Sequence, residues 1–369
     1  MDRYNVKVSA DTKLTSNWSS GFTANYITTS IDKAVTSGNG LLRTVYAAPP
    51  SYDLAGIPSH VDGNPYTQNS FRGSFDNAYW AMENNKFTED TNRFFGNVYT
   101  SYQTDFGTTN HKLNAKYMVG VDAYTTHYVD SYGYGSNTGG GRGQIENYGW
   151  TNATYNSLLT INYDWHINED WGLNAVVGNE IIQSNRKKYY EYGTNYNFPG
   201  WNHINNATTQ QTEEETWKNR TVGFFGNVSA SYRNMLYLTL TGRQDYVSNM
   251  PRKNRSFFYP SISAGFILTE LDALKNNVVN HAKLRVSYAE VGQAGDFLEN
   301  YYSTPTYGGG FYMLTPIMYP MKGTTAYTPY YTIFDPKLKP QNTRSYEVGA
   351  DVNFLDNLIT FSYTYSRQN

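Results

Sequence analysis

The feature that most constrains this chain is a set of long segments in which apolar and polar residues alternate. Apolar residues occupy every second position in Val222–Tyr232, and the pattern returns in Tyr346–Phe354 and Ile359–Ser366. A period of two is that of a β-strand with one apolar and one polar face. Strands of soluble domains have about five or six residues, whereas a tilted strand that crosses a bilayer needs about nine to eleven. The lengths therefore predict a membrane β-barrel.

The composition of the 369 residues argues against several classes of protein and of site. Mean hydropathy is −0.63, and no apolar run approaches the roughly 18 residues of a transmembrane helix. The net charge is −2, and the basic residues are scattered rather than gathered into a stripe, which argues against a nucleic-acid partner. Cysteine is absent, which excludes a disulfide scaffold, a thiolate metal site and a cysteine nucleophile.

The alternating segments and the turn residues between them predict about twelve strands. They lie near residues 3–13, 18–29, 91–104, 111–124, 154–168, 171–187, 218–233, 235–248, 257–268, 282–292, 343–354 and 358–369. Every second connection is short, and the alternate connections are long: 30–90, 125–153, 188–217, 249–256 and 293–342. This asymmetry is typical of an all-β, antiparallel, up-and-down transmembrane barrel, with short periplasmic turns and long extracellular loops.

The sequence contains no pattern typical of a catalytic or metal-binding site. The six histidines lie far apart without metal-ligand spacing, and no nucleophile motif or cofactor-binding motif is present. The charge run Glu213–Glu215 is interpreted as a solvated face at the edge of a loop. The glycines between Gly133 and Gly143 are interpreted as a flexible loop. We therefore expect no enzyme activity, no cofactor and no metal.

The long loops are rich in aromatic residues, and the chain has 36 tyrosines. Aromatic rings at the outer mouth of a barrel could stack on sugars or on peptide groups. The alternative for each is a place in the membrane girdle or in loop packing. The candidate ligand-binding residues are Trp80, Tyr132, Tyr134, Trp201, Tyr307 and Tyr312.

Four segments in the second half carry a resemblance to a known family. They are Tyr237–Asp245, Asn254–Gly265, Lys283–Gly292 and Leu338–Asp351. In sequence and in order they resemble the SusC/RagA-like TonB-dependent outer-membrane transporters. Phe266 replaces an expected tryptophan, and Gly292-Gln293 replaces Gly-Asn. These are wall and hairpin positions, so the resemblance transfers no ligand-contacting residue.

The resemblance implies a barrel of about 22 strands with a plug in its lumen. It also implies import of glycans or peptides across the outer membrane, with a SusD-like surface lipoprotein as a lid and energy from the TonB complex. Other expected contacts are with outer-membrane lipid. Residues 1–369 are then expected to be a single partial barrel domain, an internal fragment without signal peptide, TonB box, plug or closing strands.

Two alternatives remain open. One is a surface β-rich carbohydrate-binding protein without transport activity, in which the apolar faces would pack against each other in one core. The other is a glycan-cleaving enzyme with two facing carboxylates. A barrel wall instead requires a continuous outward apolar band.

Overall fold

A computed structural model describes residues 1–34, 41–137, 140–274, 276–295, 302–303, 328–329 and 334–369. The long strands are β1 Asp2–Lys13, β2 Trp18–Asp32, β5 Lys86–Thr104, β6 His111–Tyr132, β7 Gln144–His166, β8 Trp171–Tyr196, β9 Ala207–Tyr232, β10 Leu236–Val247, β11 Ser256–Ile267, β12 Val279–Gln293, β15 Gln341–Phe354 and β16 Ile359–Gln368. The minor elements are α1 Leu41–Ala47, β3 His60–Val61, β4 Asn64–Gln68, α2 Ala78–Asn84, β13 Tyr302–Ser303 and β14 Thr328–Pro329, with short 3-10 turns at Ile204–Asn206, Arg252–Asn254 and Leu268–Glu270.

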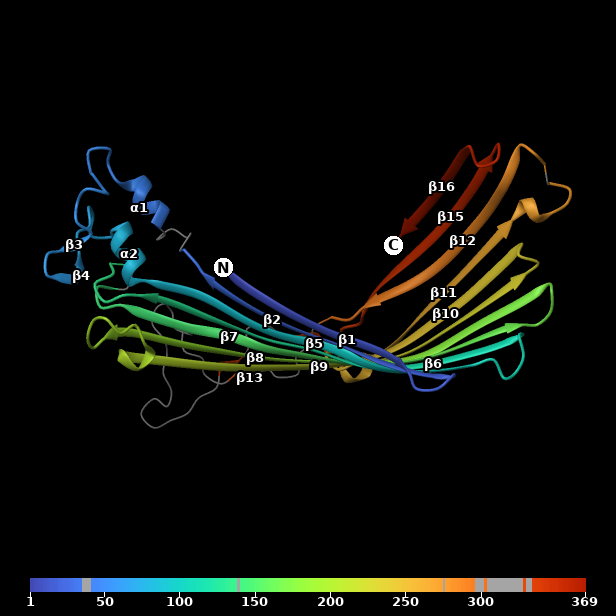
Figure 1. Ribbon diagram of the computed structural model, residues 1–369, viewed down its shortest axis with the longest axis horizontal. Helices are drawn as coiled ribbons and strands as arrows, with labels where there is room; N and C mark the ends of the chain where they lie inside the picture. Colours follow the sequence, from blue (N-terminus) through green and yellow to red (C-terminus); the bar gives the residue numbers. More distant parts are fainter. Residues whose placement is uncertain (35–40, 138–139, 275, 296–301, 304–327, 330–333) are drawn as a thin grey trace.

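The long strands form one antiparallel sheet in which each strand pairs with the next long strand along the chain. The sheet has twelve strands in the order β1-β2-β5-β6-β7-β8-β9-β10-β11-β12-β15-β16. Figure 1 shows it as a strongly curved wall with β1 at one edge and β16 at the other. The predicted all-β, up-and-down architecture of about twelve strands is confirmed, and the sheet is open in the described residues.

The apolar faces of the strands do not pack into a shared core. Val228 is 44% exposed, and in the strand register it lies opposite Leu240, which lies opposite Ile262. Val286 and Val348 face each other in the same way on β12 and β15 and are also exposed. Neighbouring strands thus carry exposed apolar side chains on the same face. This is the outward band that a barrel wall requires and a soluble sandwich lacks.

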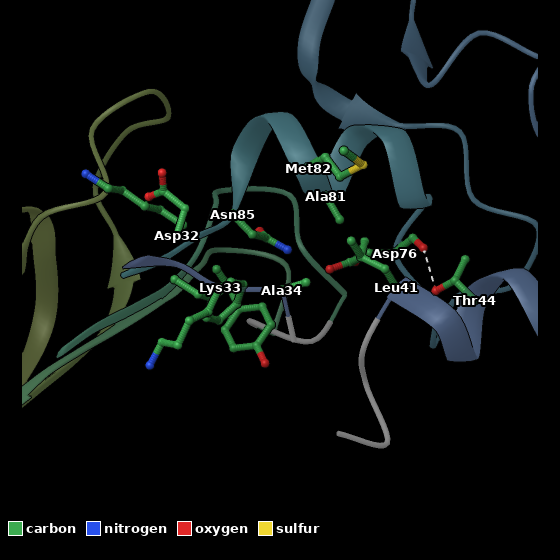
Figure 2. A pocket seen from close by; sticks show the side chains of 12 residues that line it. Asp32, Lys33, Ala34, Leu41, Thr44, Asp76, Ala81, Met82 and Asn85 are labelled. Atoms are coloured by element: carbon green, nitrogen blue, oxygen red, sulfur yellow. Dashed lines mark hydrogen bonds between the residues drawn. The ribbon is translucent and has the colours of Figure 1, made fainter. Parts of the chain in front are cut away.

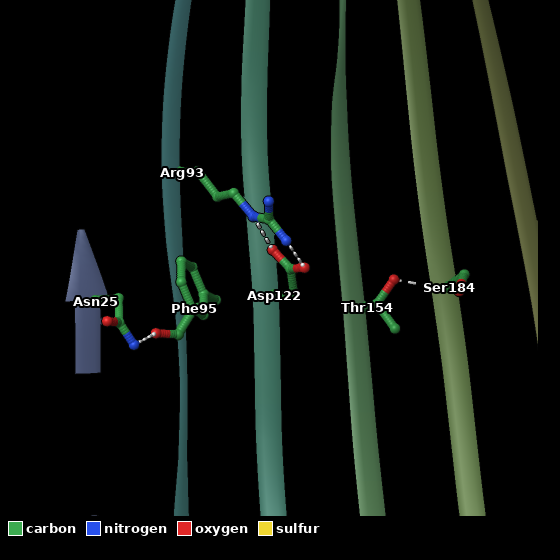
Figure 3. A network of polar contacts seen from close by, with 6 residues as sticks. All are labelled: Asn25, Arg93, Phe95, Asp122, Thr154 and Ser184. Carbon is green, nitrogen blue, oxygen red and sulfur yellow. Dashed lines mark hydrogen bonds and ion pairs between the residues drawn. The ribbon is translucent and has the colours of Figure 1, made fainter. Parts of the chain in front are cut away.

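The opposite face of the sheet is polar and is tied together by side-chain contacts between strands. Asn227 Nδ2 donates to Thr241 Oγ1 at 2.9 Å, and Arg243 pairs with both Glu180 and Asp245. Figure 3 shows the same face on earlier strands, where Arg93 of β5 forms a bidentate ion pair with Asp122 of β6. Such contacts between neighbouring strands stabilise the sheet in its register.

The two ends of the sheet differ as the sequence predicts. One end has the short connections 14–17, 105–110, 167–170, 233–235 and 355–358, and the other has the long connections, of which 33–85 is the first. The β9–β10 turn places Arg233 and Asn234 at φ values of 50° and 54°. Two consecutive left-handed residues match the twist of a tight hairpin, which explains how the chain reverses so abruptly.

Four strands are much longer than the sequence predicts. β6 runs to Tyr132, β7 begins at Gln144, β8 runs to Tyr196 and β9 begins at Ala207. The predicted loops 125–153 and 188–217 are therefore mostly strand, and only 133–143 and 197–206 connect the strands. Beyond the bilayer neither face needs to be apolar, so the alternation that marks a strand disappears while its hydrogen bonds continue.

The compact part of the molecule lies at the long-loop end. The helices α1 and α2 have seven residues each and are not predicted, because so short a segment shows too little periodicity. Asn77 caps α2, since its side chain accepts hydrogen bonds from the backbone N–H groups of Tyr79 and Trp80. Among the helices that the structure describes, none has the length and apolar character needed to cross a membrane.

Substitution of the exposed apolar band tests which face meets lipid. We expect Val228→Arg in the full-length protein to reduce folded, heat-modifiable barrel strongly, because arginine at mid-bilayer costs about 2–4 kcal/mol. The matched control is Ser229→Arg, one residue along on the polar face, where Ser229 lies within 3.0 Å of Thr239 Oγ1. Semi-native electrophoresis of outer membranes measures both variants. Equal loss from the two would contradict the assignment of faces.

Candidate functional site

Above the apolar band, the polar face carries a row of three tyrosines bracketed by two glutamates. The strand register sets Glu89, Tyr128, Tyr148, Tyr190 and Glu213 directly opposite one another on β5 to β9. Tyr190 lies nineteen residues along β8 from Trp171. At about 3.3 Å per residue this exceeds the thickness of the hydrocarbon core of a bilayer even for a strongly tilted strand. We call these five residues the tyrosine row.

The rings of the tyrosine row stack across the strands. Tyr128 and Tyr148 have ring centroids 4.8 Å apart with an interplanar angle of 7°, and Tyr148 and Tyr190 are tilted at 6.4 Å. Lys33, which follows β2, places Nζ 4.4 Å from the Tyr128 centroid. The 4.8 Å separation matches the spacing of neighbouring strands, so the sheet itself sets the stacking distance.

The two rows beside the tyrosine row add carboxylates and one cation. Towards the long loops lie Phe87, Asp130, Glu146, Tyr192 and Gln211. On the other side lie Thr91, Thr126, Trp150, Lys188 and Glu215. Lys33 approaches the edge of this surface, with Nζ 3.9 Å from Glu89 and 4.0 Å from Asp130. The three rows together hold five carboxylates and one lysine, so the surface is acidic.

Hydrogen bonds join the tyrosine hydroxyls to these carboxylates. Tyr148 Oη donates to Asp130 at 3.0 Å, and the Tyr190 hydroxyl bonds to Glu146. Burial, and then the charge of Asp130, raise the pKa of Glu146, although the bond from Tyr190 opposes the shift. Burial is also the main cause that raises the pKa of Tyr148 and of Tyr190. The surface therefore keeps its phenols protonated as hydrogen-bond donors.

The run Glu213–Glu215 lies in β9, and its interpretation as the edge of a loop is wrong. Because side chains alternate along a strand, Glu213 and Glu215 share the polar face while Glu214 lies on the other face, 2.7 Å from Lys187 Nζ. Burial and a hydrogen bond to Glu215 raise the pKa of Glu213. Glu213 therefore holds its proton more strongly than an isolated glutamate does.

Arg186 lies opposite Trp217 in the next row and contacts Trp150 of the row before it. The guanidinium carbon of Arg186 lies 5.2 Å from the Trp150 ring and 5.4 Å from the Trp217 ring. Both contacts are within cation–π range, so one cation serves two rings. These residues continue the aromatic surface towards the apolar band.

A cavity of about 440 Å³ adjoins the end of the tyrosine row where Lys33 lies (Figure 2). It lies between the ends of β2, β5 and β6 and the helices α1 and α2, and its wall includes Phe87, Tyr132 and Met82. Figure 2 also shows the Thr44 hydroxyl donating to the carbonyl of Asp76 at 3.1 Å.

Asp76 fixes the long loop 33–85 to the β6–β7 loop. Its buried carboxylate accepts hydrogen bonds from Gln68 Nε2 at 2.8 Å, from Ser136 Oγ at 2.6 Å and from the Asn137 N–H at 2.6 Å. A buried carboxylate with three donors is well satisfied. The rim of the cavity is held in place by this residue.

The structure places the predicted aromatic candidates in different settings. Trp80 has no exposed surface, and its Nε1 donates to Pro65 O at 2.8 Å. Tyr132 lines the cavity, with its ring 5.3 Å from that of Phe87. Tyr134 packs against the buried cluster of Ile145, Tyr196 and Ala207.

The remaining candidates are Trp201, Tyr307 and Tyr312. Trp201 is 43% exposed and stacks on His203 with centroids 4.9 Å apart and on Phe198 at 5.8 Å. Tyr307 and Tyr312 lie outside the described residues. Of the four candidates that the structure describes, only Tyr132 lies near the tyrosine row. This row was not predicted from the sequence. The available signal was the alternation of large side chains at Glu146, Tyr148 and Trp150.

Metal chemistry has no candidate here: within the described ranges, no three histidine or acidic side chains are grouped so that they could hold an ion. What the tyrosine row offers is a set of hydroxyl donors and carboxylate acceptors on one rigid face. Such a surface can bind and orient a ligand.

Comparison with known proteins identifies the family to which this sheet belongs. Residues 48–369 match the model of the family described as TonB dependent receptor-like, beta-barrel. The chain belongs to this TonB-dependent receptor family. It is an outer-membrane protein, as members of the family are, and the predicted resemblance to SusC/RagA-like receptors is confirmed.

Two individual relatives agree with this family assignment. TonB-dependent receptor SusC of Bacteroides thetaiotaomicron is 27% identical over 308 residues, which cover 80% of this chain and 28% of SusC. TonB-dependent receptor P26 of Formosa agariphila is 29% identical over 154 residues, covering 39% of this chain and 14% of P26. The chain thus spans less than a third of the length of either relative.

Solved structures show the same fold. The RagAB peptide transporter matches with a TM-score of 0.76 at 12% identity, over 99% of this chain and 40% of that chain. The RagAB peptide importer in its 'closed-closed' state matches with a TM-score of 0.77 at 14% identity, over 99% and 40%. At these identities the likeness concerns the fold alone.

The raised pKa of Glu146 makes a prediction about pH and stability. The folded TonB-dependent receptor holds the Glu146 proton to a higher pH than the unfolded chain does, so the free energy of unfolding falls as pH rises above the ordinary glutamate pKa. We expect Glu146→Gln to remove this fall, giving a higher Tm than the wild type at pH 7 and the same Tm near pH 4. Thermal unfolding of the full-length receptor in detergent measures both.

The control for this experiment is Glu169→Gln, in the exposed β7–β8 turn. It should leave the pH dependence of Tm as it is in the wild type. A variant Glu146→Gln that is less stable than the wild type at pH 7 would contradict the assignment.

Proposed function

We propose that this chain forms part of the wall of a TonB-dependent importer that takes up glycans or peptides across the outer membrane. In this proposal residues 1–369 are a single partial barrel domain, whose outward apolar band meets lipid. Its polar face lines the route of the substrate. Energy comes from the TonB complex, and a SusD-like surface lipoprotein acts as the lid.

The observation that carries the proposal is the tyrosine row on the polar face. The face that points away from lipid in a barrel points into the lumen, and the row lies above the apolar band near the long loops. A substrate that enters from the long-loop side must pass this surface. The family match supports transport as the use of such a face.

The cargo and the partner are supported by relatives with different names. SusC is named as a TonB-dependent receptor, and the RagAB structures are titled as a peptide transporter and a peptide importer. The RagAB titles support import as the function and peptides as one class of cargo. The alternative of a carbohydrate-binding protein without transport conflicts with the exposed apolar band, which needs lipid to cover it.

Uptake by cells tests the proposal. In the native host, the full-length receptor with Tyr148→Ala and Tyr190→Ala should accumulate labelled oligomers from its growth medium at least about tenfold more slowly than the wild type, because truncation of a central aromatic anchor costs about 2 kcal/mol or more. The abundance of folded barrel should not change. The rate of accumulation against time is the measurement.

The matched control is Tyr189→Ala. Tyr189 is adjacent to Tyr190, lies on the opposite face, and bonds to His127 Nδ1 at 2.6 Å. It should leave uptake at the wild-type rate. Retained binding of oligomers with no accumulation in energised wild-type cells would favour the binding-protein alternative and reject import.

A further inference from the structure

The ring faces of the tyrosine row are already occupied by the protein itself. Tyr128 lies between Lys33, which comes from the β2 side, and Tyr148 on β7. In the neighbouring rows, Trp150 and Trp217 share the guanidinium of Arg186. A neutral sugar binds an aromatic platform through an open ring face, and these contacts cover faces of Tyr128, Trp150 and Trp217. The surface instead presents ring edges, hydroxyl groups and carboxylates.

The charge of the surface is concentrated at the β9 end. Lys33 lies near Glu89 and Asp130, so cationic charge compensates the acids at the β5 end. At the other end Glu213 and Glu215 lie two positions apart on one strand, and Lys188 is the nearby cation in the rows. No basic side chain among the described residues lies within ion-pair distance of Glu146. An incoming cation would find three carboxylates that form no ion pair among the described residues: Glu146, Glu213 and Glu215.

An unused donor lies on the same face, two rows from the tyrosine row towards the apolar band. Asn152, on the same face of β7 as Trp150, has a buried Nδ2 without an acceptor in the described part of the chain. A buried donor without a partner costs free energy, and a carbonyl oxygen is the acceptor that best suits it. A peptide brings both carbonyl oxygens and, in basic residues, cations. An amino-sugar oligomer brings the cations but depends on open ring faces for the rest of its binding.

The length of the surface sets the size of the ligand. From Glu89 to Glu213 there are four strand spacings of about 4.8 Å, or roughly 19 Å. An extended peptide of about five or six residues covers that distance. The row crosses the strands at right angles, so the peptide would lie across the wall.

We infer that the tyrosine row and its flanking carboxylates form a recognition site for short basic peptides, with Glu213 and Glu215 binding a lysine or arginine side chain. This inference rests on the proposed importer function and specifies its cargo. Carboxylates select the cation by charge-assisted hydrogen bonds, and the tyrosine hydroxyls hold the peptide backbone. The acidic surface also concentrates basic ligands from solution in a salt-dependent way.

Binding to the full-length receptor in nanodiscs tests the site. The probes are a pentapeptide with two lysines, the same pentapeptide with two glutamines, maltopentaose and a glucosamine pentamer. Calorimetry should give the tightest Kd for the lysine peptide, and added NaCl should weaken it. Glutamine-peptide, maltopentaose or glucosamine-pentamer binding as tight as that of the lysine peptide would overturn the assignment.

Two isosteric variants locate the interaction. The double variant Glu213→Gln/Glu215→Gln should raise the Kd of the lysine peptide about tenfold or more, since a hydrogen bond to a charged group contributes about 1.5–3 kcal/mol, and should not change the Kd of the glutamine peptide. Glu214→Gln, between them on the opposite face, should change neither. An equal effect of Glu214→Gln, or no effect of the double variant in a barrel that still folds, would overturn the proposed site.

Uptake assays separate this inference from the importer function. If wild-type cells accumulate oligomers but the wild-type receptor binds the lysine peptide no more tightly than the glutamine peptide, import stands and the basic-peptide site is rejected. If the wild type accumulates no oligomer of any class, the proposed function itself fails.

Discussion

Backbone hydrogen bonding between neighbouring strands is the constraint on which the rest of the structure depends. A strand in lipid has no water to satisfy its N–H and C=O groups, so each one must pair with the next strand. The simple order of the sheet, in which each long strand pairs with its successor, meets this requirement with short turns at one end. The pairing also fixes the register, and a slip of one residue would turn apolar side chains to the wrong face.

The same strand pairing continues beyond the bilayer and keeps the strands ordered there. β6, β7, β8 and β9 continue their pairing past the apolar band, and there the pairing no longer serves the membrane. Side chains that face each other in the register now meet as rings and carboxylates. The tyrosine row is therefore a consequence of strands that keep pairing where lipid does not require them to.

The sequence predicts the alternating strands and the loop lengths that crossing a lipid bilayer requires. It does not predict which side chains the strand register brings together. Alternation at Val222–Tyr232 is visible because one face must be apolar, and the segregation of loop lengths follows from the chain crossing back and forth. Tyr128, Tyr148 and Tyr190 lie on three strands and become neighbours only once the register is known. No pattern along a single segment reveals that. The sequence places Trp80 in a long loop as a candidate ligand-binding residue but does not reveal that it is buried, because its partners come from the fold of that loop.

A surface built from paired strands has an advantage over one built from loops. The stacking distance of 4.8 Å between Tyr128 and Tyr148 is imposed by the hydrogen bonds of β6 and β7, so these side chains have little conformational freedom left to lose on binding a ligand. The loops around it are fixed separately, by the buried carboxylate of Asp76. The tyrosine row and the loops above it therefore depend on different sets of hydrogen bonds, so a change in the loops leaves the row in place.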